Sequence, residues 1–257
     1  MRRWLLAVIA AGGIMAGEAR AQTESQPLVV FSGGSMVEAL KLAGADYTHM
    51  TGRAVRFEAG TTGVIQGKVR DGQAVDVIVI STEGLLELEQ EGLLQPGQPV
   101  PVADAVLGVG VKAGAARPDI STPTAFKAAM LAAKSVTYPD PDKGATAGVY
   151  LRGLFHKMGI DTEMAAKTVL KPMGAASAAA VQAGEVEVVV TFASEMKPFK
   201  GVDVVGLLPD PILNPIPYSA AVSAKAADLK GAREFVAFVT SQKEKARLEE
   251  AGVRRAR

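Results

Sequence analysis

The sequence contains no cysteine, and its histidines are His49 and His156. The lack of cysteine excludes disulfides, thiolate metal sites and thiol nucleophiles. Two histidines, both expected on helix surfaces, leave little material for a zinc site or a Ser-His-Asp triad. We therefore predict no metal or other cofactor. Stability must come from the hydrophobic core, which is feasible for 257 residues because the buried fraction of the surface rises with chain length.

The sequence also lacks an excess of charge of either sign. Lysine and arginine together number 28 and aspartate and glutamate 27, a formal net charge of +1. Nucleic-acid binding requires a concentrated basic face, so we expect no nucleic-acid partner. A small anionic ligand would have to be held by local donors rather than attracted by the net field of the protein.

The one long apolar run stands at the N-terminus. Arg2 and Arg3 precede the apolar residues Trp4–Ala11, a run too short to span a bilayer comfortably, and Ala19-Arg20-Ala21 has the small-x-small pattern that a signal peptidase cleaves. We predict a signal peptide over residues 1–21, cleaved after Ala21, and a periplasmic protein. A retained membrane anchor is the alternative that the short run disfavours. Without residues 1–21 the formal net charge is about −1.

Short apolar runs alternate with amphipathic stretches along the rest of the chain. Strands are expected at residues 28–31, 55–57, 75–80, 105–111, 136–138, 185–192 and 218–222. Helices are expected at residues 36–50, 64–70, 83–94, 123–133, 149–158, 175–183 and 231–249. This alternation is typical of an α/β fold in which mainly parallel sheets are flanked by helices.

The order of these elements predicts two lobes. Residues 22–104 and 218–257 would form the first lobe and residues 105–217 the second, in a monomer. Two chain crossings, near Ala105 and near Tyr218, would then form a hinge, and closure of such a hinge over a ligand is a recurrent device.

Three turns rich in glycine and hydroxyl residues lead into helices. They are Ser32-Gly33-Gly34-Ser35, Gly60-Thr61-Thr62-Gly63 and Gly144-Ala145-Thr146-Ala147-Gly148. A helix start offers unpaired N–H groups and a partial positive charge, so such a turn can hold an oxyanion without a full cation. For one turn alone, N-capping is the more frequent role of such a hydroxyl residue. Three turns at the carboxyl ends of strands, where α/β proteins bind ligands, favour an anion site in a cleft between the lobes.

Several other residues are candidates with two interpretations each. Lys143 fits a ligand-binding cation or a solvated loop lysine. Glu195 fits an acid in the cleft or a carboxylate that complements a helix start, and we favour the second. Tyr138 and Tyr218 fit the cleft lining or packing at the hinge.

The turns, together with Ala74-Val75-Asp76-Val77 and Asp140-Pro141, resemble the molybdate-binding periplasmic proteins of ABC importers over nearly the whole chain after residue 21. The resemblance implies a type II periplasmic binding fold, an oxyanion held by neutral donors and ABC importer membrane subunits as partners. By motif, Ser35 and Thr62 would supply hydroxyls of the first lobe and Ala147 a backbone donor of the second. The full predicted ligand-binding set is Ser32, Ser35, Thr61, Thr62, Lys143, Thr146, Ala147 and Phe192.

The chain departs from the molybdate pattern at three places. Phe192 stands where those proteins usually have a tyrosine, Ser81-Thr82-Glu83 replaces Ser-Ala-Asp, and Lys143 adds a cation. The pattern Gly-Thr-x-Gly from Gly60, with Asp-Pro-x-x-Gly-x-x-x-Gly from Asp140, resembles a divergent branch of the same superfamily that includes aconitate isomerase. Two functions therefore stay open: capture of a small anion for an importer, or allylic proton transfer that interconverts cis- and trans-aconitate, with Lys143 or Glu195 as the base.

Overall fold

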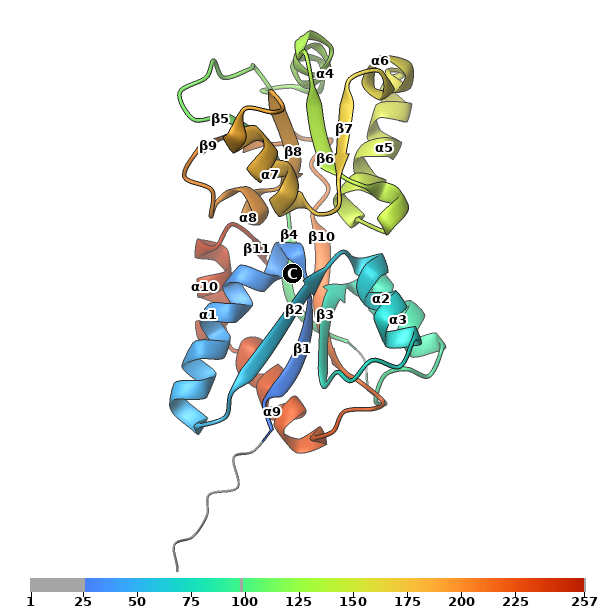
Figure 1. Cartoon of the computed structure of the whole chain (residues 1–257), viewed down its shortest axis with the longest axis vertical. Helices are drawn as coiled ribbons and strands as arrows, with labels where there is room; N and C mark the ends of the chain where they lie inside the picture. Colours follow the sequence, from blue (N-terminus) through green and yellow to red (C-terminus); the bar gives the residue numbers. More distant parts are fainter. Residues whose placement is uncertain (1–25, 98, 257) are drawn as a thin grey trace, which may run out of the picture.

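The computed structural model describes residues 26–97 and 99–256. The predicted signal peptide lies outside these residues. Two mixed sheets, each flanked by helices, follow one another along the long axis of the molecule (Figure 1). This arrangement confirms the predicted α/β, two-lobed architecture. Within residues 26–97 and 99–256, no helix has the length and apolar character that crossing a membrane requires.

The first lobe is built on a six-stranded sheet of order β11-β4-β10-β3-β1-β2. Its strands are β1 (Leu28–Gly33), β2 (Val55–Gly60), β3 (Val77–Ser81), β4 (Val100–Ala105), β10 (Ile216–Val222) and β11 (Arg254–Arg255). Its helices are α1 (Gly34–Thr51), α2 (Thr62–Arg70), α3 (Thr82–Gln90), α9 (Leu229–Val239) and α10 (Gln242–Glu250).

The second lobe is built on a five-stranded sheet of order β7-β6-β8-β5-β9. Its strands are β5 (Leu107–Lys112), β6 (Val136–Pro139), β7 (Thr168–Lys171), β8 (Val188–Phe192) and β9 (Val202–Leu207). Its helices are α4 (Pro123–Ala132), the 3₁₀ turn η1 (Pro141–Lys143), α5 (Thr146–Met158), α6 (Asp161–Ala165), α7 (Gly174–Ala183) and α8 (Ala193–Met196).

The chain passes between the two sheets twice, from β4 to β5 and from β9 to β10. The first crossing corrects the single strand predicted over residues 105–111. Val106 separates β4 from β5, and because Val106 is itself buried and apolar, no residue between positions 105 and 111 marks the break. The residue boundaries predicted for the lobes, and their movement as a hinge, stay predictions.

The prediction of mainly parallel sheets was too simple. β1 pairs in parallel with β2 and β3, and β6 with β7 and β8. In contrast, β10, β4 and β11 add antiparallel pairs to the first sheet, and β5 and β9 add them to the second. The antiparallel strands include the four that adjoin the crossings, so the crossings account for most of the departure from the parallel pattern.

The helix predicted over residues 231–249 is two helices. α9 ends at Val239, and Ser241 caps α10 by accepting a hydrogen bond from the backbone N–H of Glu244. Ser-x-x-Glu is a capping-box pattern, which was the signal for this break.

Burial on both faces explains why β3 reads as an unbroken apolar run. Val77 and Val79 pack in the core cluster shared with α1 and α9. Ile78 and Ile80 point the other way, into a cluster with residues of α2 and α3. A strand covered on both faces loses the usual alternation of polar and apolar residues.

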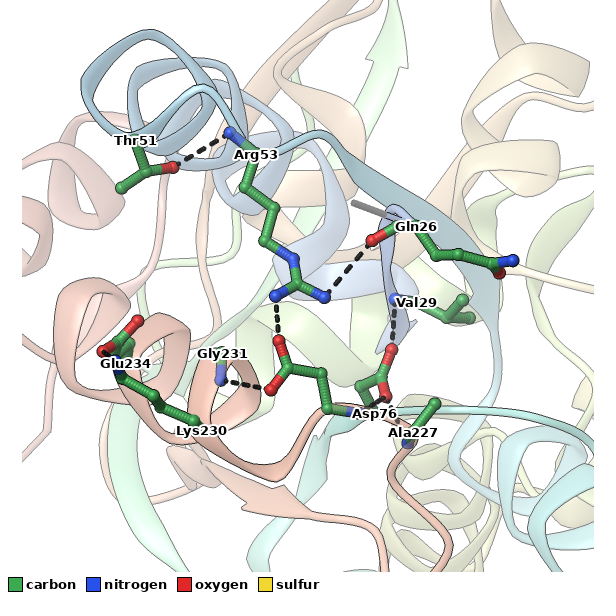
Figure 2. Close-up of polar contacts among 10 residues, drawn as sticks. Gln26, Val29, Thr51, Arg53, Asp76, Ala227, Lys230, Gly231 and Glu234 are labelled. Atoms are coloured by element: carbon green, nitrogen blue, oxygen red, sulfur yellow. Dashed lines mark hydrogen bonds and ion pairs between the residues drawn. The ribbon is translucent and has the colours of Figure 1, made fainter. Parts of the chain in front are cut away.

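A buried carboxylate joins three segments at the amino end of the first sheet (Figure 2). Asp76, which precedes β3, accepts hydrogen bonds of 2.8 Å from the backbone N–H groups of Val29 and Ala227, and a longer bond of 3.4 Å from that of Asp228. Asp228 in turn pairs with Arg53. The Asp76 motif therefore supports the fold, because it lies at the end of β3 opposite to the glycine-rich turns.

Candidate functional site

A small cavity lies where the two lobes meet, at the carboxyl ends of β1, β2, β6 and β8. Its volume is about 20 Å³, room for about one ordered water. It is lined by Gly34, Ser35, Gly60, Thr61, Thr62, Pro139, Ala145, Thr146, Ala147, Met173, Gly174, Phe192, Glu195 and Tyr218.

Four helices begin at the wall of this cavity. Gly34, Thr62, Thr146 and Gly174 are the first residues of α1, α2, α5 and α7. α2 is capped by Thr61, whereas no side chain caps the other three. Helix starts present unpaired N–H groups and a partial positive charge. The cavity is therefore surrounded by backbone donors, and its described lining contains no lysine or arginine.

The sheet register brings these turns together. β1 and β2 are parallel, with Gly33 opposite Gly60, so the turns that follow them lie side by side. β6 and β8 are likewise parallel neighbours in the second sheet. Parallel pairing places the carboxyl ends of neighbouring strands at one edge of a sheet, where α/β proteins bind ligands.

Tyr218, on β10, brings a phenol into the cavity. Its hydroxyl shares a hydrogen bond of 2.9 Å with Thr146 Oγ1, and its ring meets that of Phe192 edge to face at 6.1 Å. Burial raises the pKa of Tyr218, and hydrogen bonding with Ser35, Thr146 and Thr62 partly offsets this rise. Ser35 Oγ is buried near this phenol without a hydrogen bond of normal geometry to any described residue. It is therefore available to a ligand.

Glu195 is the carboxyl group of the cavity wall. It lies in the short helix α8 and is 7% exposed. Thr191 Oγ1 donates a hydrogen bond of 2.6 Å to Glu195 Oε2, and the backbone N–H groups of Phe192 and Gly174 also stabilise the carboxylate. Burial outweighs these bonds and raises the pKa of Glu195 to about 7. Near neutral pH this group can therefore both donate and accept a proton.

Direct contacts join the two lobes at the cavity. Thr61 Oγ1 donates to the backbone carbonyl of Lys143 at 2.5 Å, and the backbone N–H of Gly63 donates to the carbonyl of Gly144 at 3.1 Å. Glycine is required at both of these positions, because a Cβ on either one would overlap the backbone of the other.

Comparison with known proteins places the chain in a family. Residues 28–254 match the family described as bacterial extracellular solute-binding protein. The chain belongs to this family. An aconitate isomerase from a Pseudomonas species is 28% identical over 233 residues, which cover 88% of this chain and 87% of the relative.

Solved structures of solute-binding proteins share the fold. The periplasmic molybdate-binding protein of Azotobacter vinelandii aligns with a TM-score of 0.73 at 17% identity, covering 90% of this chain and 100% of its own. PEB3 of Campylobacter jejuni, solved with bound L-phospholactate, aligns with a TM-score of 0.68 at 14% identity, covering 89% and 100%. The match to the protein of Azotobacter vinelandii confirms the resemblance to the molybdate-binding proteins. The match to the Pseudomonas enzyme confirms the resemblance to aconitate isomerase.

The structure brings most of the predicted site residues of this solute-binding protein together. Those that line the cavity are Ser35, Thr61, Thr62, Thr146, Ala147, Phe192 and Glu195. Ser32 lies outside it and donates to the carbonyl of Gly33 at 3.1 Å. Lys143 does not line the cavity, and its side chain is exposed. Its backbone carbonyl accepts the hydrogen bond from Thr61, which does line the cavity.

The structure gives the positions of the residues for which the sequence allowed two interpretations. Glu195 lies in the first turn of a helix and also lines the cavity, so both of its interpretations describe its position. Tyr138 packs against Phe155 at 5.8 Å in the core of the second lobe and does not line the cavity. His49 and His156 are exposed, as expected.

Sequence reasoning left two parts of the cavity wall unassigned. Tyr218 was considered but not chosen, because a tyrosine in an apolar strand has no distinguishing pattern. The start of α7, at Met173 and Gly174, carries no hydroxyl residue and so resembled none of the three turns. Its role in the wall depends on contact with Glu195.

Proposed function

We propose that this protein is exported to the periplasm and captures a small anion bearing carboxylate groups between its two lobes. The observation that carries the proposal is the convergence of four helix starts and a set of hydroxyls on one cavity whose described lining has no cationic side chain. Helix starts and neutral donors are sufficient to hold an anion. We infer that the protein works as a monomer and delivers its ligand to the membrane subunits of an ABC importer.

Three features favour an organic carboxylate over a tetrahedral inorganic oxyanion. Phe192 offers no phenolic donor where molybdate-binding proteins usually have a tyrosine, and the phenol of the cavity comes from Tyr218 instead. Identity to the aconitate isomerase is 28%, compared with 17% to the molybdate-binding protein of Azotobacter vinelandii. PEB3, with the same fold, was solved with L-phospholactate, which carries a carboxylate beside its phosphate, so this fold accommodates an organic acid.

Thermal unfolding in the presence of candidate anions tests the proposal. The protein without residues 1–21 would be heated with molybdate, tungstate, sulfate, citrate, cis-aconitate or trans-aconitate. A ligand that binds only the folded state adds about 2.7 kcal/mol to its stability at 100 times Kd. We expect stabilisation by the tricarboxylates. Stabilisation by molybdate or tungstate alone would contradict the carboxylate preference, and no stabilisation by any anion would contradict anion capture.

A second candidate function is isomerisation of aconitate, and Glu195 favours it. The cavity holds an ionisable carboxyl whose pKa of about 7 suits proton transfer at neutral pH, whereas the side chain of Lys143 lies outside. As a carboxylate, Glu195 would remove a proton from one allylic carbon of aconitate as the double bond shifts. It would return the same proton to the former vinyl carbon at the other end of the three-carbon unit, so that the double bond re-forms at the carbon that was deprotonated.

Ultraviolet detection of the conversion of cis- to trans-aconitate tests this second function. Glu195→Gln should abolish turnover while binding survives, and Lys143→Ala should keep full turnover. A wild-type protein that binds both isomers without converting either would leave capture as the function.

A further inference from the structure

The site proposed for an anion contains a carboxyl group of the protein itself. Glu195 bridges the starts of two helices from different lobes: its Oε1 lies against Gly34 of α1 and its Oε2 against Gly174 of α7. A Cβ at Gly174 would overlap this carboxyl group, so the chain leaves the space for Glu195 by having no side chain there. Glu195 thus occupies donors that would otherwise serve an external anion.

No described cation offsets the charge of Glu195. The elements packed against α8 are α1, α7, β5, β8 and β9. α7 and β8 contain no titratable residue. Lys112 of β5 lies beside Gly184, at the end of α7 opposite to Gly174, and Asp203 of β9 accepts a hydrogen bond from the backbone N–H of Gly114. The charged residues nearest on the outer side line a separate groove with Ser194; they are Glu38, Lys41, Lys197 and Glu250. Tyr218 is the remaining titratable group that faces Glu195.

Two negative charges cannot share so small and dry a space without strong repulsion, and in such a pair one group becomes protonated. We propose that Glu195 takes up a proton when an anion binds, and that its O–H then donates a hydrogen bond to that anion. An anion and a proton therefore enter the site together. This inference rests on the proposed function, since it concerns the same cavity, and it makes Glu195 a determinant of which ionic species the site accepts.

Glu195 has the proton affinity that this coupling needs. Burial raises the pKa of Glu195 to about 7, so this carboxyl group is partly ionised at neutral pH, and a bound anion raises its pKa further. Below this range the site is already protonated, and affinity should not depend on pH. Above it each binding event takes up one proton, so the affinity should fall about tenfold per pH unit.

Isothermal titration calorimetry measures the proton directly. The probes are trans-aconitate and molybdate, both fully ionised above neutral pH, so a proton taken up must go to the protein. Titrations in two buffers of different ionisation enthalpy, at about pH 6 and about pH 8, give the number of protons bound. We expect an uptake close to one proton at the higher pH and close to none at the lower, with Kd rising about tenfold per unit above pH 7.5.

Variants supply the second readout. Glu195→Gln should bind with a Kd that does not change with pH and with no proton uptake, whereas Glu163→Gln, an exposed carboxyl of α6, should behave like the wild type. Binding of a probe to the wild type without proton uptake would overturn this inference and leave anion capture intact. Absence of binding by both the wild type and Glu195→Gln at every pH would overturn the two together. The wild-type measurement alone is decisive if Glu195→Gln does not fold.

Discussion

A buried carboxyl group lies at each end of the strands of the first lobe, and the surroundings of the two groups are opposite in kind. At the amino end, Asp76 is surrounded by backbone N–H groups and lies beside the Arg53–Asp228 ion pair (Figure 2). At the carboxyl end, Glu195 of the second lobe lines the cavity with a raised pKa, and the described lining contains no cationic side chain. The polar groups at the amino end therefore hold the fold, whereas those at the carboxyl end form the site proposed for an anion.

The largest expected effect is at the amino end. Asp76→Ala would leave the buried N–H groups of Val29 and Ala227 without acceptors, so we expect the free energy of unfolding to fall by about 3–5 kcal/mol, given 1–3 kcal/mol for each unsatisfied group. Urea unfolding measures this loss. Any variant protein that folds should keep wild-type anion affinity, and a loss below about 1 kcal/mol would show that the contacts of Asp76 are dispensable.

The next effect concerns the carboxyl end, where ionisation of the buried carboxyl group of Glu195 destabilises the fold. The folded-state pKa of Glu195 is raised to about 7 from an ordinary 4.5, so its protonated form stabilises the fold below pH 4.5 and this stabilisation is lost as pH rises through 7. Relative to Glu195→Gln, the wild type should lose about 3 kcal/mol between pH 4.5 and 8. Urea unfolding over this pH range measures the difference. Parallel pH dependence of the two proteins would contradict the assignment.

A smaller effect concerns the hydroxyls. Ser35→Ala combined with Thr62→Ala removes two donors from the cavity, and we expect anion affinity to fall more than tenfold, about 1.4 kcal/mol. Calorimetry measures the affinity. Thr122→Ala is the matched control, since Thr122 caps α4 away from the cavity and should cost stability without changing affinity. Unchanged affinity in the double variant would remove the hydroxyls from the site.

The smallest expected effect concerns the hydroxyl of Tyr218. This residue supplies the phenol of the cavity, because Phe192 stands where molybdate-binding proteins usually have a tyrosine. Tyr218→Phe keeps the ring that meets Phe192 and removes only the hydroxyl shared with Thr146. One lost hydrogen bond is worth about 1 kcal/mol, so affinity should weaken roughly fivefold. Equilibrium binding measurements detect a change of this size, and an unchanged Kd would assign Tyr218 to packing at the crossing.

Local patterns in the sequence predicted much of this molecule. The apolar run of β3 and the glycine-hydroxyl turns before α2 and α5 could be recognised because strand burial and helix starts depend on neighbouring residues. Boundaries that depend on partners could not. The break at Val106 and the antiparallel course of β10 follow from the passage of the chain between two sheets, which no window of the sequence contains.

The same limit applies to the candidate site. Ser35, Thr62 and Thr146 could be proposed from their turns, but Tyr218 joins them only because β10 lies beside β3. Glu195 was predicted to complement a helix start, and its place in the cavity follows from contact with α1 and α7, which lie far from it in sequence. Lys143 was predicted as a candidate ligand-binding cation, but its side chain is exposed.

The closing contacts between Thr61 and Lys143, between Gly63 and Gly144, and between Thr146 and Tyr218 have a kinetic consequence. If the predicted hinge opens to release a ligand, these three contacts must part, so the residence time would depend on the opening rate of the protein as well as on the contacts of the ligand. Thr61, Thr146 and Tyr218 also line the cavity, whereas Gly63 and Gly144 do not, so only the glycine contact could be strengthened without altering the donors proposed for the ligand.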